Sequence, residues 1–387
     1  MTDNIAIRKY TRELVLSTFE GRTPGPVPAG MTITEIIEIA NKGQMPYLLF
    51  NSLLKVAGDS EEADRIKNAL VISTMKTFRQ VFTAKEISTA FEKYGIRHQI
   101  LKGTVMKNLY PSPEMREMSD IDLVVYDENL DRAAKVMEDM GFINHGLIKH
   151  HMIFSKGKGL LVEVHWCLID KSVDRRQYLH FKDNFNSNLK EGFNYTYEFG
   201  IEDFYVYMIA HMAKHFFETG CGVRNLVDIY VYQNKYADDM NKEYLYKELD
   251  ACGIRDFEEN MRKLAFIWLE DKECSKFYEN LFSYMLDSGI YGKGENGVWS
   301  QLAKETEKGN SSAKIHYFFP SIRFMKEKYV WLEKMPFLLP VAWGIRFVSA
   351  VFNKKSLRNM EMFKNSSNEN VDTMLEIYHT LGLNYRR

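Results

Sequence analysis

The spacing of apolar residues divides the chain into three regions. Over residues 9–95 the apolar positions recur mostly at helical spacing, as in "TEIIEIANKGQMPYLLFNSLLKVAG". Prolines at 24, 26 and 28 interrupt this pattern and exclude one continuous helix there. We therefore expect an all-helical N-terminal region over residues 1–94.

The pattern changes at Gly95 to shorter segments. The stretches "IRHQILKG" and "MSDIDLVVY" are typical of strands, and each precedes a helical segment, "TVMKNLY" and then "NLDRAAKVMEDMG". The following "HMIFSKGKGLLVEVHWCLI" predicts two strands joined by a turn at residues 156–159. These segments predict one compact α/β unit over residues 95–195.

From Glu202 onward the apolar spacing is helical again. In "EDFYVYMIAHMAKHFFETGCGVRNLVDIYVYQNKY", Gly220 and Gly222 separate two predicted helices. We expect a C-terminal helical domain over residues 196–387. The predicted fold class is α+β, with a small mixed sheet flanked by an N-terminal and a C-terminal helical region.

Charge and cysteine content narrow the class of protein. The chain has 51 basic and 52 acidic residues, which argues against nucleic-acid binding through bulk positive charge. Its four cysteines lie far apart without zinc-ligand spacing, so free thiols are expected. The N-terminal "MTDNIAIRKYTRELVLSTFE" is too charged for a signal peptide. We expect a cytoplasmic protein.

Two aspartates lie in the otherwise apolar end of "LKGTVMKNLYPSPEMREMSDIDLVV". Residues two apart on a strand point to the same face, so Asp120 and Asp122 should project together. Two such carboxylates repel each other unless a cation lies between them, and Mg²⁺ prefers oxygen ligands. The pair predicts a magnesium site, with a structural or surface pair as the alternative.

Two further features favour the metal site. The turn at Gly103 and Thr104 lies between a strand and a helix, where backbone N–H groups favour bound phosphate. Downstream, "LLVEVHW" places Glu163 at the centre of an apolar strand, with His165 on the same face. A third carboxylate on a neighbouring strand is what two metal ions would require.

These residues resemble a known superfamily. The order Gly-Thr, Asp-Ile-Asp and a later acid on a strand resembles the DNA polymerase beta-like nucleotidyltransferases. More closely, "VEVHW", "GCGVRNLVDIYVY" and "PFLLPVAWGIRF", together with the aspartate stretch, are similar to an uncharacterised bacterial nucleotidyltransferase family over most of the chain. Two features differ from the general pattern. Lys102 stands where the first of two glycines is usual, and the spacing to Asp120 is longer.

The resemblance implies a nucleotidyltransferase core that moves a nucleoside monophosphate from an NTP to an acceptor, a hydroxyl of a small molecule. Mg²⁺, or Mn²⁺ in its place, would be the cofactor. The implied catalytic and metal-binding residues are Asp120, Asp122 and Glu163. The candidates for nucleotide binding are Lys102, Gly103, Thr104 and Arg116. The candidates for acceptor binding are His165, His211 and His215.

Several alternatives remain open from the sequence. His165 is equally consistent with a buried core histidine, and Arg116 with a surface residue. Arg224 and Asp228 can pair along one helix, where a packing role is favoured over catalysis. For the whole protein, the alternatives are an antitoxin-type enzyme that modifies a protein or RNA, and an inactive scaffold of the same fold.

The stretch 335–352, "MPFLLPVAWGIRFVSAVF", contains one charged residue and two prolines. It is too short and too interrupted for a membrane span. Residues 323–358 hold eight basic and two acidic residues, which is also typical of weak contact with an anionic membrane surface. That interpretation requires Phe337, Trp343 and Phe347 to be exposed together, whereas a helix packed on the bundle would bury them.

Overall fold

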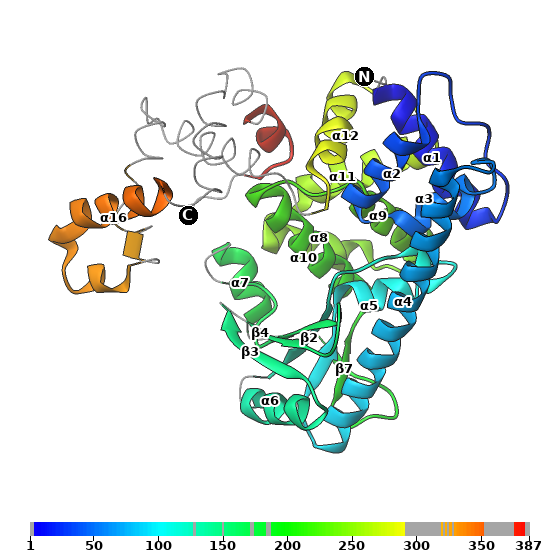
Figure 1. The fold of residues 1–387 in the computed structure, drawn as a ribbon. Helices are drawn as coiled ribbons and strands as arrows, with labels where there is room; N and C mark the ends of the chain where they lie inside the picture. The colour runs from blue at the N-terminus through cyan, green and yellow to red at the C-terminus, as the bar shows by residue number, and fades with distance from the viewer. Residues whose placement is uncertain are drawn as a thin grey trace.

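A mixed seven-stranded sheet lies beside helices from both ends of the chain in the computed structural model, which confirms the α+β class (Figure 1). The structure describes residues 4–126, 129–148, 151–170, 174–182, 187–290, 319, 322, 325–326, 329–351 and 375–383. Both flanks of the sheet are helical, as the apolar spacing predicts.

The N-terminal region is all-helical in its described part, and two of its helices begin at capping side chains. Thr32 and Glu35 form a reciprocal capping box at the start of the second helix. The Ser60 hydroxyl accepts from the Ala63 N–H at the start of the fourth helix. The helices are α1 (Asn4–Glu20), α2 (Ile33–Gly43), α3 (Pro46–Leu53) and α4 (Glu61–Lys93).

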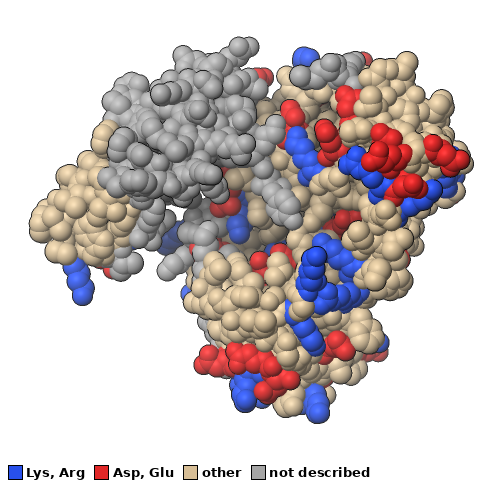
Figure 2. Space-filling model, in the orientation of Figure 1, with Lys and Arg blue, Asp and Glu red and all other residues tan. Residues whose placement is uncertain are grey.

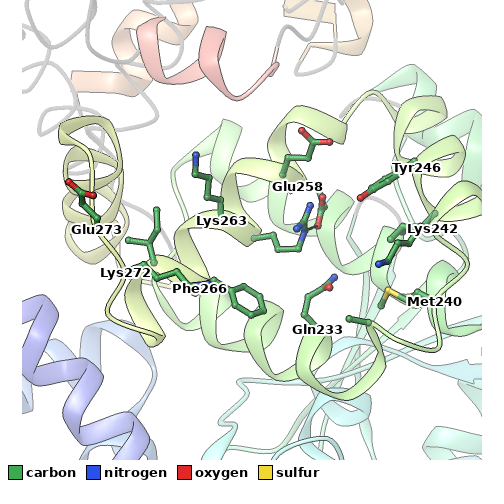
Figure 3. Close-up of a pocket in the computed structure, with 14 residues that line it drawn as sticks. Gln233, Met240, Lys242, Tyr246, Glu258, Lys263, Phe266, Lys272 and Glu273 are labelled. Atoms are coloured by element: carbon green, nitrogen blue, oxygen red, sulfur yellow. Dashed lines mark hydrogen bonds and ion pairs between the residues drawn. The ribbon is translucent and has the colours of Figure 1, made fainter.

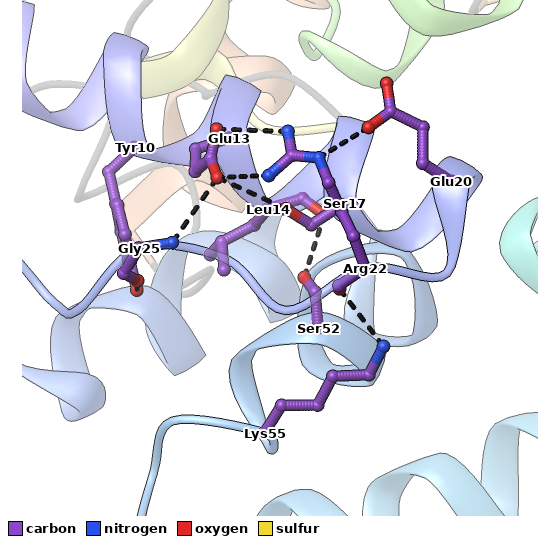
Figure 4. A network of polar contacts seen from close by, with 9 residues as sticks. All are labelled: Tyr10, Glu13, Leu14, Ser17, Glu20, Arg22, Gly25, Ser52 and Lys55. Atoms are coloured by element: carbon purple, nitrogen blue, oxygen red, sulfur yellow. Dashed lines mark hydrogen bonds and ion pairs between the residues drawn. The ribbon is translucent and has the colours of Figure 1, made fainter.

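The proline-containing loop between α1 and α2 is held by polar contacts instead of by a helix (Figure 4). The guanidinium of Arg22 pairs with the carboxylates of Glu13 and Glu20. From the turn that follows α3, Lys55 Nζ donates to the carbonyl oxygens of Gly21 at 2.7 Å and of Arg22 at 3.0 Å. These contacts satisfy backbone groups that a helix would otherwise pair.

The sheet has the strand order β3-β4-β5-β2-β1-β7-β6. Strand β2 runs parallel to β5, and β1 runs parallel to β7, whereas the other neighbours are antiparallel. The strands are β1 (His98–Ile100), β2 (Ile121–Val125), β3 (Ile143–Ile148), β4 (His151–Ser155), β5 (Leu161–His165), β6 (Ser187–Leu189) and β7 (Thr196–Phe199). The hairpin predicted around residues 156–159 is formed by β4 and β5.

Alternation along β2 gives the two faces of the sheet different partners. Ile121, Leu123 and Val125 pack into a core with α4 and α6, while Val124 packs into the core of the helical body and Asp122 shares its face. The remaining short elements of this region are α5 (Lys102–Lys107), the 3₁₀ turn η1 (Pro113–Met115), α6 (Leu130–Asp139) and α7 (Arg175–Lys182).

The helices that precede the sheet in the sequence and those that follow it form one body with a shared core. The Trp268 indole N–H donates to the Arg8 carbonyl at 3.0 Å, and Arg12 Nε donates to the Leu269 carbonyl at 3.1 Å. The C-terminal helices are α8 (Ile201–Glu218), α9 (Arg224–Tyr236), α10 (Lys242–Cys252), α11 (Arg255–Leu269) and α12 (Lys276–Ser288). The domain boundaries at 94 and 195 stay a prediction, and β7 lies just beyond the second.

Four elements were not predicted: β3, α7, β6 and β7. All six residues of β3 are exposed, and its register shifts between Asn144 and Leu147, so its sequence shows no alternation of apolar and polar residues. Strands β6 and β7 have three and four residues, which is too short for a periodic signal.

The stretch that begins at Met335 forms the 3₁₀ turn η4 (Pro336–Leu338) and α16 (Leu339–Val351), after the turn η3 (Val330–Glu333). Phe337 is 74% exposed, whereas Trp343 is partly buried and its ring lies 5.2 Å from that of Phe319. The side chain of Phe347 and residue 352 lie outside the described residues. Because Phe337 and Trp343 differ in exposure, membrane contact stays a prediction.

Hydropathy and surface charge complete the description of the fold. Within the part of the chain that the structure describes, no helix combines the length and the apolar character that crossing a bilayer requires. Lys, Arg, Asp and Glu are interspersed on the face that Figure 2 shows, in line with the nearly balanced charge of the chain.

Candidate active site

A pocket of about 400 Å³ lies between the sheet and α8. The sheet and the start of α5 contribute its charged wall, which consists of Lys102, Asp120, Asp122, His151, Glu163 and His165. Helix α8 contributes Tyr207, His211 and His215. All three carboxylates predicted from the sequence therefore line one cavity.

Strand register brings the acidic and imidazole side chains together. Asp122 on β2 stands opposite Glu163 on the parallel neighbour β5. On the other side of β5, His151 of β4 stands opposite His165. Because residues two apart share a face, Glu163 and His165 both point to the side of Asp122. Asp120 lies just before β2 and lines the same pocket.

His165 lies between the two carboxylates of neighbouring strands. Its Nε2 is 3.0 Å from Asp122 Oδ1 and 3.3 Å from Glu163 Oε2. His151 Nε2 is 3.8 Å from Glu163 Oε1 on the opposite side. His165 is buried, as the alternative from the sequence expected, but it is also part of the carboxylate cluster.

Lys102 neutralises Asp122 from the other side. Its Nζ is 2.7 Å from Asp122 Oδ1, the oxygen that His165 also contacts. Lys102 has φ of +44°, in the left-handed region that favours glycine. Lys102 thus adopts a backbone conformation that is usually found at glycine, and its side chain forms the ion pair with Asp122.

The cluster has opposite effects on its two aspartates. Burial disfavours the charge of Asp122, but Lys102 and the His165 hydrogen bond outweigh it and hold its pKa well below the ordinary value. Burial, followed by the charges of Asp122 and Glu163, raises the pKa of Asp120 to about 6. Burial also disfavours charge on Glu163, but the His165 hydrogen bond keeps its pKa below the ordinary value.

Among the described residues, one group of donor atoms lies close enough together to hold a metal ion. His151, Glu163 and His165 each offer one ligand atom, and these atoms lie within 4.8 Å of one another. The carboxylate set of Asp120, Asp122 and Glu163 is not such a group in the protein without metal, so a metal site on these three residues stays a prediction. Carboxylate oxygens suit Mg²⁺, and imidazole nitrogens suit transition-metal ions.

The residues of the predicted phosphate turn differ in placement. Gly103 lines the pocket, and a Cβ atom there would lie 2.8 Å from Arg116 Nη1 and 3.0 Å from Met118 Sδ. A larger residue at this position would have to displace the buried side chains of Arg116 and Met118. Thr104 does not line the pocket, and its hydroxyl faces Met118 Sδ at 3.7 Å.

Arg116 lines the pocket but is held by α9. Its Nη2 and Nε lie 2.9 Å and 3.1 Å from the two carboxylate oxygens of Asp228, which also accepts from the Tyr110 hydroxyl at 2.8 Å. The partner of Asp228 is thus Arg116. The helix spacing had suggested Arg224 instead. Arg224 Nη1 instead donates to the Glu117 carbonyl at 3.0 Å.

His211 and His215 form a contact pair on α8, with their Nε2 atoms 3.2 Å apart. Burial and the nearby positive charges of Lys214 and Lys102 lower the pKa of His215 to about 4. Burial and Lys102 also hold the pKa of His211 well below its usual value. Both imidazoles are therefore neutral at pH 7.

His151 is the residue of this cluster that the sequence interpretation missed. The signal was present, because a hairpin centred on the turn at residues 156–159 sets residue 151 opposite residue 165. Counting outward from the turn gives this pairing directly.

A larger groove of about 850 Å³ lies over α9, α10 and α11 (Figure 3). Its buried carboxylate, Glu258, accepts from Arg262 Nε and from the Tyr205 hydroxyl, each at 2.7 Å. Glu258 is thus paired with Arg262, whereas the charged wall of the pocket beside the sheet gathers three carboxylates around one lysine, with Asp228, Lys214, Arg116 and Arg224 on the rest of its lining. We therefore place the candidate active site in the pocket beside the sheet.

Comparison with known families identifies the class of protein. A family model described as an uncharacterised nucleotidyltransferase matches residues 30–270. The chain belongs to this nucleotidyltransferase family. The match covers more than half of the chain, from α2 to α11, and contains the whole charged wall of the pocket. The chain has no significant match among curated proteins or among solved structures.

Proposed function

We propose that this nucleotidyltransferase moves a nucleoside monophosphate from an NTP to a hydroxyl group of a small molecule. The observation that supports this most is the parallel register that sets Asp122 opposite Glu163 in the pocket that Asp120 also lines. In the proposed reaction, the acceptor oxygen bonds to the α-phosphorus. The bond from the α-phosphorus to the bridging oxygen breaks, and pyrophosphate leaves with the electron pair. The hydroxyl proton passes to a carboxylate of the pocket.

The donor set fits divalent metal ions. Three carboxylates and one lysine form the charged wall of the pocket, and burial together with the charges of Asp122 and Glu163 raises the pKa of Asp120. Asp120, Asp122 and Glu163 would hold Mg²⁺, and the nitrogens of His151 and His165 make Mn²⁺ a second candidate. Bound metal would stabilise the negative charge on the transferred phosphate and lower the pKa of the acceptor hydroxyl.

The chain's own residues have separate roles in this proposal. Lys102 is the positive group nearest to the carboxylates, so it would contact the triphosphate when a cation takes its place at Asp122. Gly103 keeps the turn close to the pocket, and Thr104 would contribute through its backbone. Arg116 is a weaker candidate for phosphate binding, because Asp228 holds its guanidinium.

The shape of the pocket favours a small acceptor. A volume of about 400 Å³ is at the lower end of the range for small-molecule sites. His211 and His215, neutral at pH 7, would accept or donate hydrogen bonds to an uncharged hydroxyl compound, and His165 would reach it from the sheet. The two imidazoles on α8 therefore form the proposed acceptor side.

Product analysis tests the acceptor class. The purified protein is incubated with each NTP, Mg²⁺ or Mn²⁺, and separate metabolite, RNA and protein fractions of a cell extract. Mass spectrometry should find a product heavier by one nucleoside monophosphate residue in the metabolite fraction. Modification of only RNA or protein would support the antitoxin-type alternative, and no product in any fraction would support an inactive scaffold.

A further inference from the structure

In the middle of α4, which runs along the edge of the molecule (Figure 1), apolar side chains face solvent and polar side chains are buried. Its large apolar side chains point to solvent and are between 58% and 68% exposed: Val71, Ile72, Met75, Phe78 and Phe82. Its buried side chains over the same turns are polar: Ser73, Thr77, Gln80 and Thr83. A helix of a monomer normally has the opposite arrangement.

The buried polar face is explained by contacts within the chain. Ser73 Oγ donates to Glu117 Oε1 at 2.8 Å. Thr77 Oγ1 accepts from the buried Lys107 Nζ at 3.0 Å, and Gln80 Nε2 donates to the Met118 carbonyl at 3.1 Å. Three contacts thus anchor the segments that border the pocket. Within the described part of the chain, no such contact accounts for the exposed apolar face.

The exposed apolar face has the spacing of a helix-pairing seam. Val71, Met75, Phe78 and Phe82 are separated by four, three and four residues, which is the spacing of a and d positions in paired helices. The five exposed side chains present on the order of 600 Å² of apolar surface, at the upper end for a monomer. A standard interface buries about 800 Å² on each partner, so this seam and its rim are large enough for one.

We propose that two copies of the chain pair through this face of α4, with the helices antiparallel. A two-fold axis between residues 76 and 77 places Val71 opposite the partner's Phe82, and Met75 opposite the partner's Phe78. Each layer then combines one aromatic ring with one smaller side chain, which fills the seam evenly. A two-fold pair uses the same surface on both chains and closes on itself.

Side-chain size favours the antiparallel direction. A parallel pair in register would place Phe78 opposite the partner's Phe78 and Val71 opposite the partner's Val71, so some layers would be crowded and others loosely filled. Charge does not decide the direction, because both ends of α4 carry both signs: Glu61, Glu62 and Asp64 with Arg65 and Lys67 at the start, and Lys85 and Lys93 with Glu86 and Glu92 at the end.

The oligomeric state of the full chain tests this proposal. Sedimentation across a concentration series should show twice the mass of one chain, with a reversible shift to monomer on dilution. Phe78→Lys should raise the dissociation constant more than tenfold, because it places charges in the seam. Phe337→Lys introduces the same charge at another exposed phenylalanine and should leave the dimer intact.

Cysteine crosslinking tests whether the two α4 helices are antiparallel and whether the partner is a second copy of the chain. Chains with Val71→Cys should crosslink to chains with Phe82→Cys, and Val71→Cys alone should not, because its two copies would be about 16 Å apart along an antiparallel pair. Self-crosslinking of Val71→Cys would overturn the direction. A monomer at every concentration would overturn the pairing, and so would a dimer that is insensitive to Phe78→Lys. Asp122→Asn should remain dimeric, so this test is independent of the proposed function.

Discussion

Asp122 and Glu163 stand opposite each other on parallel neighbouring strands, and one nitrogen of His165 contacts both carboxylates, at 3.0 Å and 3.3 Å. Lys102 completes the charge compensation of Asp122 at 2.7 Å. Asp120 has no comparable compensation, and its pKa is raised. The two aspartates of one Asp-x-Asp pair therefore have opposite electrostatic roles in the protein without metal.

Asp122→Asn should lower both activity and stability. The change removes a proposed metal ligand, so activity should fall by more than about 100-fold, beyond the loss seen for residues that only support ligands. It also leaves the partly buried Lys102 ammonium without its anion, at a cost of about 2 kcal/mol in unfolding free energy. Denaturant unfolding, combined with an activity assay, measures both effects. From the sequence alone, loss of a like charge at this position suggested unchanged or higher stability.

Asp120→Asn is the matched variant with the opposite effect on stability. It removes a charge that burial and two neighbouring carboxylates disfavour, so the melting temperature in EDTA should hold or rise while activity is lost. A melting temperature that falls as far as in Asp122→Asn would show that the two aspartates have equivalent environments, contrary to the structure.

The raised pKa of Asp120 makes stability depend on pH. An unfolded aspartate titrates near 3.9, whereas Asp120 in the folded protein titrates at about 6. Between these values the folded state keeps a proton that the unfolded state has released, so this group lowers stability as pH rises from about 4 to 6. The melting temperature of Asp120→Asn minus that of the unsubstituted protein should grow over this range in EDTA. A constant difference would contradict the assignment.

His151 should matter more for Mn²⁺ than for Mg²⁺. Its imidazole belongs to the set with Glu163 and His165, and nitrogen ligands contribute little to Mg²⁺ sites. His151→Ala should weaken Mn²⁺ binding by roughly 10- to 100-fold, with a smaller effect on Mg²⁺. Calorimetric titration with each ion measures the two affinities. His145→Ala, on exposed β3, is the control and should leave both unchanged.

Arg116 and Asp228 should behave as a structural pair. Both are buried, and their two contacts join the segment before β2 to α9. Arg116→Gln or Asp228→Asn should each lower the unfolding free energy by about 3 kcal/mol, and the double variant by less than the sum of the two. An NTP KM that rises only in Arg116→Gln, with stability unchanged, would instead assign Arg116 to phosphate binding.

Local sequence patterns were sufficient to predict the helical flanks, β2, the β4–β5 hairpin and the three carboxylates of the pocket's charged wall. Alternation in β2 and β5 is strong because one face of each strand lies in an apolar core. Strand β3 escaped prediction because it is exposed on both faces. Helix spacing suggested Arg224 for Asp228, but the true partner, Arg116, comes from a segment more than 100 residues away.

The position of the label in the product tests the central claim most directly. The protein, Mg²⁺ and a metabolite fraction are incubated with NTP labelled at the α-phosphate or, in parallel, at the γ-phosphate. Nucleotidyl transfer predicts that the product carries the α-label and lacks the γ-label, that pyrophosphate forms in equal amount, and that Asp122→Asn abolishes both signals. Transfer of the γ-label, or α-label transfer that survives in Asp122→Asn, would contradict the proposed function.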